Sequence, residues 1–318
     1  MSPHADEAIP EPTTPGAQGN YRSTDENMMF QPPVENKMPH SPFVQGMHYK
    51  RTLAQFSLEN TVSVITGGAR GLGLVMAQAL VMSGSNVAIV DLNKEEGEYQ
   101  AENLLRQFKQ ENNGLEQLPT ITAHYADASN PDSVNAAIAE VLEKHGKIDN
   151  LVTSAGFTEN FDAIHYPYDR MQKCWAVNVD GTYLFAVGVA KHLIERQSPG
   201  SIVMIGSMSG AIVNVPQPQA PYNAAKAAVR QLAASLAVEW APYNIRVNCI
   251  SPGYMLTALT RKILDEKPEM KEKWTSLIPT GKMGSPEDLM GPVTFLLSDA
   301  SKYVTGADLR VDGGYTLI

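Results

Sequence analysis

The chain of 318 residues is 43% hydrophobic and 19% charged, which are ordinary proportions for a globular protein. Its formal net charge of −9 argues against nucleic acids and anionic membrane surfaces as partners, and no apolar run approaches the roughly 20 residues that span a bilayer. The two cysteines, Cys174 and Cys249, lie far apart in the sequence, and the seven histidines have no metal-ligand spacing. We therefore expect a soluble, metal-free protein of a reducing compartment, which indicates the cytoplasm.

Residues 1–55 differ from the rest of the chain, because they are rich in proline and polar residues and lack helical or strand periodicity. Their acidic start has neither the apolar core of a signal peptide nor the arginine bias of a mitochondrial leader. We expect a flexible extension that is partly ordered near residues 43–56, where aromatic side chains could pack on the domain. Residues 56–318 are then expected to form one domain.

The first periodic stretch predicts a strand, a glycine turn and a helix in that order. Residues 61–66 form a short apolar strand that leads into a glycine-rich turn. Glycines at such a turn let the backbone approach a pyrophosphate, and the N-terminus of the next helix stabilises its charge. The pattern indicates a dinucleotide-binding loop, although a tight structural turn could have the same sequence. The residues of this turn are Gly67, Arg70, Gly71, Leu72 and Gly73.

An acidic residue ends the second predicted strand, residues 86–90. Asp91 follows this strand and lies 24 residues after Gly67. A carboxylate there can accept hydrogen bonds from the adenosine ribose hydroxyls and would repel a 2′-phosphate. Arg70 could instead pair with that phosphate. The sequence therefore favours NAD(H), with NADP(H) still possible.

Strands and helices continue to alternate along the chain. Further strands are expected at residues 120–125, 150–154, 201–205, 245–250 and 309–311, and helices at 95–110, 131–145, 178–194, 221–241 and 286–297. This alternation predicts an α/β protein with a Rossmann-type, doubly wound parallel sheet of about seven strands and helices on both faces. Ligands bind such sheets at the carboxyl ends of the strands, where Gly71, Asp91, Asp127 and Gly156 fall.

Tyr222 and Lys226 are four residues apart on the helix that begins near Pro221. Their side chains therefore share one helix face, one turn apart. A free tyrosine has a pKa of about 10, and a neighbouring ammonium group favours the phenolate. The pair could transfer protons at neutral pH, although a tyrosine and a lysine that merely touch would have the same spacing.

Five motifs in order resemble the short-chain dehydrogenase/reductase family over residues 55–318: the glycine turn, Asn178, Ser207, Tyr222 with Lys226, and Pro252-Gly253. The resemblance implies that Tyr222 is the general acid/base and that Lys226 lowers the pKa of Tyr222 and holds the nicotinamide ribose. It also implies that Ser207 orients the substrate oxygen and that Asn178 binds a proton-relaying water. The cofactor-binding residues implied are Gly67, Arg70, Gly71, Leu72, Gly73, Asp91, Asp127, Gly156, Tyr222, Lys226, Met255 and Thr257.

The sequence departs from the family pattern at two places. The usual Asn-Asn-Ala-Gly turn has Thr153 and Ser154 at its first two positions, so its side-chain hydrogen bonds must differ. Ser207 and Tyr222 are 15 residues apart, a little more than is usual in the family. Ser209 is a second candidate for the serine, but Ser207 better fits the position just after the strand.

Within the family, residues 251–260 and the proline-rich extension are similar to fungal polyol dehydrogenases and ketose reductases of the D-arabinitol dehydrogenase or sorbose reductase type. The implied reaction is hydride transfer between a nicotinamide cofactor and a polyol/ketose pair, such as D-arabinitol and its ketose. Gln217, Gln219 and Tyr254 could meet a polyhydroxylated chain. The alternatives are an NADPH-dependent carbonyl reductase of apolar or polyketide ketones and a non-catalytic nucleotide-sensing scaffold.

The resemblance also implies a homotetramer. The Tyr222 helix has Ala224, Ala228 and Leu232 on one side, and the family commonly pairs this helix across a two-fold axis. Residues 315–318 would make a second contact, in which the apolar Leu317 and Ile318 are buried. A frayed terminus is the alternative.

Overall fold

A computed structural model describes residues 52–318 except residues 116, 258–259, 262–263 and 266–267. Most of the predicted extension, residues 1–51, therefore lies outside the described residues. Its last part, Thr52–Phe56, is a 3-10 helix. The Phe56 ring packs against the Phe295 ring with centroids 6.2 Å apart, so an aromatic side chain of the segment 43–56 does contact the domain.

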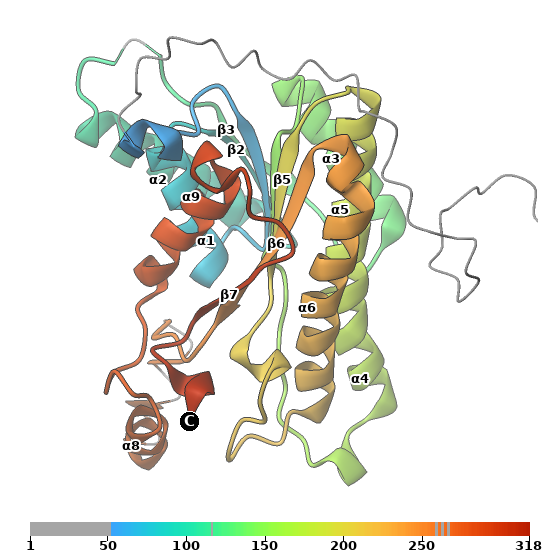
Figure 1. Ribbon diagram of the computed structural model, residues 1–318, viewed down its shortest axis with the longest axis vertical. Coiled ribbons are helices and arrows are strands. Elements are labelled where there is room, and N and C mark those ends of the chain that lie inside the picture. The colour runs from blue at the N-terminus through green and yellow to red at the C-terminus, as the bar shows by residue number, and fades with distance from the viewer. Residues whose placement is uncertain (1–51, 116, 258–259, 262–263, 266–267) are drawn as a thin grey trace, which may run out of the picture. The chain divides into compact units, whose positions relative to one another are not determined.

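Seven parallel strands form one sheet in the order β3-β2-β1-β4-β5-β6-β7 (Figure 1). The chain moves outward from β1 to β3, returns to β4, and then moves outward to β7, so the direction reverses between β1 and β4. A ligand crevice forms at the carboxyl ends of the strands where this reversal occurs. The predicted doubly wound sheet is confirmed. The strands are β1 (Val62–Thr66), β2 (Asn86–Asp91), β3 (Ile121–Tyr125), β4 (Asn150–Thr153), β5 (Gly200–Ile205), β6 (Ile245–Pro252) and β7 (Asp308–Val311).

Helices cover both faces of the sheet because successive strand residues point to opposite sides and both sides are apolar. In β1, Val64 packs into the core beneath α3, α5 and α6, whereas its neighbour Ile65 packs into the core beneath α1, α2 and α9 (Figure 1). Each face therefore has its own apolar core. The α-helices with bounds in the described part of the chain are α1 (Gly71–Met82), α2 (Lys94–Glu111), α3 (Pro131–His145), α4 (Tyr168–Trp175), α5 (Gly181–Glu195), α6 (Ala220–Trp240), α8 (Pro268–Ser276) and α9 (Met290–Leu297).

Two predicted helices differ in detail from the observed ones. The helix expected at 286–297 is a 3-10 turn, Pro286–Leu289, followed by α9, and Ser285 and Asp288 form a capping box at its start. The helix expected from Asn178 is joined to α4 through a π-turn at Ala176–Asp180. Helical periodicity alone predicts neither feature, because both depend on side-chain hydrogen bonds.

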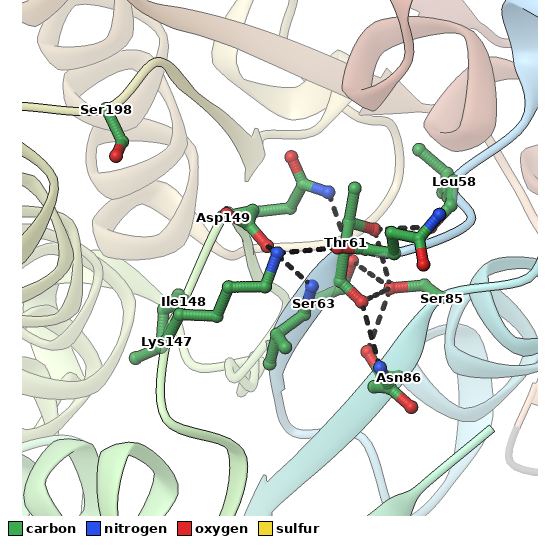
Figure 2. A network of polar contacts seen from close by, with 12 residues as sticks. Leu58, Thr61, Ser63, Ser85, Asn86, Lys147, Ile148, Asp149 and Ser198 are labelled. Carbon is green, nitrogen blue, oxygen red and sulfur yellow. Dashed lines mark hydrogen bonds and ion pairs between the residues drawn. The ribbon is translucent and has the colours of Figure 1, made fainter.

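A polar network joins the amino ends of β1, β2 and β4 (Figure 2). Ser85 Oγ lies 3.0 Å from Thr61 Oγ1 and 2.8 Å from Ser63 Oγ, and Asp149 Oδ2 accepts a hydrogen bond from the Val62 N–H at 2.8 Å. These bonds satisfy polar groups that the sheet buries. The network therefore stabilises the amino ends of these strands, opposite the predicted ligand crevice at their carboxyl ends.

Candidate active site

The glycine turn brings the start of α1 close to the turn after β4. Gly67 has φ +64°, and a Cβ atom there would lie 2.8 Å from Ala155 Cα. A Cβ on Gly73 would lie 2.1 Å from the Gly67 carbonyl oxygen, so only glycine fits either position. Gly71, at the first residue of α1, has open space instead, with nothing within 4 Å of its Cβ position. An anionic group can therefore approach the backbone at the helix N-terminus.

Two carboxylates lie at the ends of neighbouring strands. Asp91 ends β2 and is 8% exposed; its Oδ2 accepts from the Ala69 N–H at 3.1 Å, and its Oδ1 accepts from the Asn93 N–H at 3.0 Å. Asp127 follows β3, and hydrogen bonds from Ser129 lower the pKa of its carboxyl. Both groups are held in place from the protein side and retain acceptor capacity for a ligand.

Tyr222 and Lys226 lie together on the first turns of α6. Lys226 is 6% exposed; its Nζ donates to the Ile205 carbonyl at 2.9 Å and lies 5.7 Å from the centroid of the Tyr222 ring. Burial lowers the pKa of Lys226 to about 8 and raises the pKa of Tyr222 to about 12. A hydrogen bond with Ser207 opposes the shift of Tyr222.

Ser207 follows β5 after one intervening residue, Gly206, and caps a short 3-10 helix, Met208–Gly210, that packs against α6. A Cβ on Gly210 would lie 2.6 Å from the Lys226 carbonyl carbon, so the two segments touch at backbone distance. The structure thus brings Ser207 to Tyr222. Ser209, the second candidate for the serine, is 5% exposed, and its hydroxyl accepts hydrogen bonds from Ser207 Oγ and Gln219 Nε2.

Asn178 lies in the π-turn, and its side chain lies beside Gly156, close to Lys226. Its Nδ2 donates to the Cys174 carbonyl at 2.9 Å and to the Phe157 carbonyl at 2.9 Å. In an α-helix the Cys174 carbonyl would accept from the Asn178 backbone, so the side chain replaces that bond and the helix widens. Asn178 Oδ1 is buried without a partner among the described residues. A Cβ on Gly156 would lie 2.6 Å from this oxygen and 3.5 Å from Lys226 Nζ.

The segment after β6 completes one side of the crevice. The Met255 carbonyl accepts from the Thr257 N–H at 3.0 Å and from Thr260 Oγ1 at 2.7 Å. A cavity of about 330 Å³ separates this segment from the glycine turn, and Gly71, Leu74 and Thr257 are among its lining residues. Gly71 and Thr257, both expected to bind the cofactor, therefore line one space.

Of the three residues expected to meet substrate, only Gln219 is buried. Gln219 is 5% exposed and turns into the protein, whereas the Tyr254 hydroxyl donates to Gln217 Oε1 at 3.1 Å. Sequence reasoning missed Trp274, which stacks on Tyr254 with ring centroids 4.2 Å apart. The α8 helix that carries Trp274 has no strong apolar periodicity, so only its aromatic side chain could have drawn attention to it.

The assembled groups can exchange a proton between a phenol and a small molecule beside a backbone cradle for a dinucleotide. The cradle fits a nicotinamide dinucleotide, because Gly71 leaves the helix N-terminus open and a side chain at Gly156 would collide with Asn178 Oδ1. Among the residues that the structure describes, no group of three or more His, Cys, Asp or Glu side chains could hold a metal ion. No helix in that part of the chain is long and apolar enough to cross a membrane.

Residues 67–316 match the family described as enoyl-(acyl carrier protein) reductase. The chain is 41% identical to a D-arabinitol 2-dehydrogenase [ribulose-forming] from Candida tropicalis, over 84% of this chain and 96% of the relative. It is 39% identical to an NADH-dependent L-xylulose reductase from Ambrosiozyma monospora, over 82% and 97% of the two chains.

Two solved structures share the fold closely. A short-chain type dehydrogenase/reductase from Mycobacterium marinum has a TM-score of 0.77 and 32% identity, over 84% of this chain and 100% of that one. A gluconate 5-dehydrogenase from Burkholderia cenocepacia J2315, in complex with NADP and tartrate, has a TM-score of 0.75 and 34% identity over the same shares. With its motifs, its parallel sheet and these matches, the chain belongs to the short-chain dehydrogenase/reductase family of nicotinamide-dependent oxidoreductases.

Proposed function

We propose that the chain interconverts a polyol and its ketose with a nicotinamide cofactor, D-arabinitol and its ketose being the first pair to test. The observation that carries the proposal is the convergence of Ser207, Tyr222 and Lys226 beside Gly156, in the turn that also contacts the glycine turn. The polyol class is supported by the relatives named above, which are described as a D-arabinitol 2-dehydrogenase and an L-xylulose reductase.

In this proposal Tyr222 is the general acid/base. The cofactor, when bound, accepts or supplies the hydride. Tyr222 takes the hydroxyl proton of the polyol during oxidation and returns it to the carbonyl oxygen during reduction. Lys226, as an ammonium group, favours the phenolate form of Tyr222 and holds the nicotinamide ribose. Ser207 donates a hydrogen bond to the reacting oxygen.

In this proposal Asn178 binds a water molecule that takes part in proton transfer. Its buried Oδ1, which has no partner in the described part of the chain, lies beside Lys226 and Gly156 and can accept a hydrogen bond from a water or a cofactor hydroxyl. A water bound there could carry protons between Lys226 and solvent. The glycine turn, Asp91, Asp127, Gly156, Met255 and Thr257 would hold the cofactor along the carboxyl ends of the strands.

We propose NAD(H) as the preferred cofactor. Asp91 is nearly buried, and both of its oxygens accept backbone N–H bonds that fix the carboxylate at the end of β2. This fixed negative charge suits ribose hydroxyls and repels a 2′-phosphate. Arg70 is exposed in the glycine turn, where it gives NADP(H) partial compensation.

We also propose a cytoplasmic homotetramer, with residues 56–318 as one catalytic domain. Cys174 and Cys249 are free and buried, which is the usual state of cysteines in a reducing compartment. The outer side of α6 exposes Ala224 and leaves Leu232 partly exposed, so the helix offers small and apolar side chains to a second copy. A fluorescent fusion of the full chain tests the compartment.

The substrate test is a panel of polyols with NAD⁺ or NADP⁺, and of ketoses and apolar ketones with the reduced cofactors. We expect cofactor reduction with D-arabinitol or a related polyol, and the reverse reaction with its ketose. Turnover of apolar ketones alone would favour a carbonyl reductase. Nucleotide binding without any turnover would favour a sensing scaffold. Either result contradicts the proposal.

A further inference from the structure

Gln219 lies immediately before α6, yet its side chain makes no capping hydrogen bond to that helix. Glutamine is not among the residues that favour this position. The side chain is 5% exposed and turns inward instead. Its Nε2 lies 3.2 Å from Ser209 Oγ, 3.1 Å from Asn214 Oδ1 and 2.9 Å from Asn223 Oδ1. A buried amide with this many partners indicates a positional role, because a buried polar group is costly unless it is hydrogen-bonded.

Ser209 connects this amide to Ser207. Ser207 Oγ donates to Ser209 Oγ at 3.1 Å, and the Ser209 backbone N–H donates to Ser207 Oγ at 3.1 Å. Ser209 is 5% exposed, so its hydroxyl has no access to bulk water that could replace a lost partner. Ser207 in turn lies beside Tyr222 and opposes the rise in the pKa of its phenol. A chain of hydrogen bonds thus runs from Gln219 to Ser207, the neighbour of the proposed acid/base.

We propose that Gln219 is a positioning residue for Ser207 and acts through Ser209. A hydroxyl has one proton and two acceptor sites. On Ser209, the Gln219 N–H occupies one acceptor site and the Ser207 hydroxyl occupies the other, so the Ser209 rotamer is fixed. Ser207 Oγ is then held beside Tyr222, and its one proton, which Ser209 accepts here, turns to the reacting oxygen when substrate binds. The inference rests on the role proposed above for Ser207.

The amide must be shared, which makes the position sensitive to substitution. Nε2 has two protons, whereas three acceptor oxygens lie within 3.2 Å of it. Asn223 is on the first turn of α6 and Asn214 is in the preceding loop, so one side chain links the loop, the helix and the serine segment. Loss of this link should displace Ser207 more than it displaces Lys226, which is held by the Ile205 carbonyl.

The test measures kcat and KM of the full-length enzyme for polyol oxidation. Gln219→Met keeps the side-chain length and removes the donor, and Ser209→Ala breaks the chain with little change in volume. We expect each to lower kcat by about 10-fold, since small displacements of a catalytic group are costly. Cofactor affinity, measured by quenching of protein fluorescence, should stay unchanged. Gln107→Met on α2, whose side chain is exposed, is the control and should keep wild-type kcat.

The decisive comparison repeats both substitutions in a Ser207→Ala background. If Gln219 acts through Ser207, each should then change kcat by less than about 2-fold, because coupled residues are not additive. A further 10-fold loss in that background would overturn the inference and leave the proposed function intact. Full activity of Ser207→Ala itself would contradict the proposed role of Ser207, and the inference would fall with it.

Gln219→Glu supplies a readout that a packing defect would not show. An ionised carboxylate cannot donate to Ser209, but a protonated carboxyl group can. We expect the ratio of variant to wild-type kcat to rise as the pH falls. A ratio that is independent of pH, in a variant that still binds the cofactor, would contradict donation by residue 219.

Discussion

Lys226 is the residue on which the chemistry of the site depends most. Its ammonium group is nearly buried and donates to the Ile205 carbonyl, and burial lowers its pKa to about 8. Near neutral pH it is still mostly charged, so in the proposed mechanism it favours the phenolate of Tyr222, whose pKa burial otherwise raises to about 12. Above about pH 8 it loses the proton in the free enzyme, which is the direction that desolvation imposes on a lysine.

Asp91 gives a prediction on cofactor choice. Wild type should use NAD(H) better than NADP(H), and Asp91→Ala should narrow the difference, because repulsion of the 2′-phosphate disappears. The measurement is kcat/KM for each cofactor with one polyol. Arg70→Ala is the matched variant, and it should harm NADP(H) more than NAD(H). A strong wild-type preference for NADP(H) would show that Arg70, rather than Asp91, decides the choice.

At the residue scale, the family resemblance, rather than spacing alone, implied which side chains converge. Ser207, Tyr222 and Lys226 are together, as the resemblance implied. The inward turn of Gln219 was not predictable, because a glutamine before a helix can equally face solvent. The position of Asn178 Oδ1 also depends on the π-turn, which the hydrophobic periodicity of the sequence does not predict.

Among the elements, the 3-10 helix Met208–Gly210 is the one that joins the serine to α6. Gly210→Ala should destabilise the protein by about 1–3 kcal/mol and lower kcat, because the added Cβ would lie 2.6 Å from the Lys226 carbonyl carbon. Gly291→Ala on α9 is the matched control, since nothing lies within 4 Å of its Cβ position. That change should raise the free energy of unfolding of the protein by up to about 1 kcal/mol. Thermal unfolding midpoints that move in the same direction for both would contradict this account.

Element boundaries followed from sequence where local chemistry is explicit. Asn130 caps α3 by accepting from the Asp132 and Ser133 N–H groups, and α6 ends at Trp240, just before Pro242. The short helices α4 and α8 were not predicted, because neither has a long apolar stripe. Each is instead placed by tertiary contacts, such as the stacking of Trp274 on Tyr254.

For the whole molecule, alternation of strands and helices was enough to predict the sheet, since connections of this type are parallel and covered on both faces. Contacts between copies of the chain are harder to predict from the sequence, because the residues that form such contacts follow no regular spacing. In the single chain Tyr315 is 8% exposed, whereas Leu317 is 79% and Ile318 is 84% exposed. Two exposed apolar residues beside a buried tyrosine are the reason to expect a contact there.

Removal of Leu317 and Ile318 should weaken the proposed tetramer, because it removes apolar surface that would be buried between copies. Light scattering of the full chain and of the shortened chain, over a range of concentrations, measures this. The full chain should be tetrameric, and the shortened chain should dissociate at higher concentration. A full chain that is monomeric, or a tetramer indifferent to the truncation, would contradict burial of this end.

The most direct test of the account is the initial rate of NAD⁺ reduction by D-arabinitol, followed against pH in wild type and in Tyr222→Phe. Oxidation requires Tyr222 to accept a proton, so the wild-type rate should rise with pH up to about 8, the range in which Lys226 keeps the charge that favours the phenolate. Tyr222→Phe should lose turnover by about 10²-fold or more at every pH and still bind NADH. A phenylalanine variant that keeps the wild-type rate and its rise with pH would contradict the assignment of Tyr222 as the acid/base.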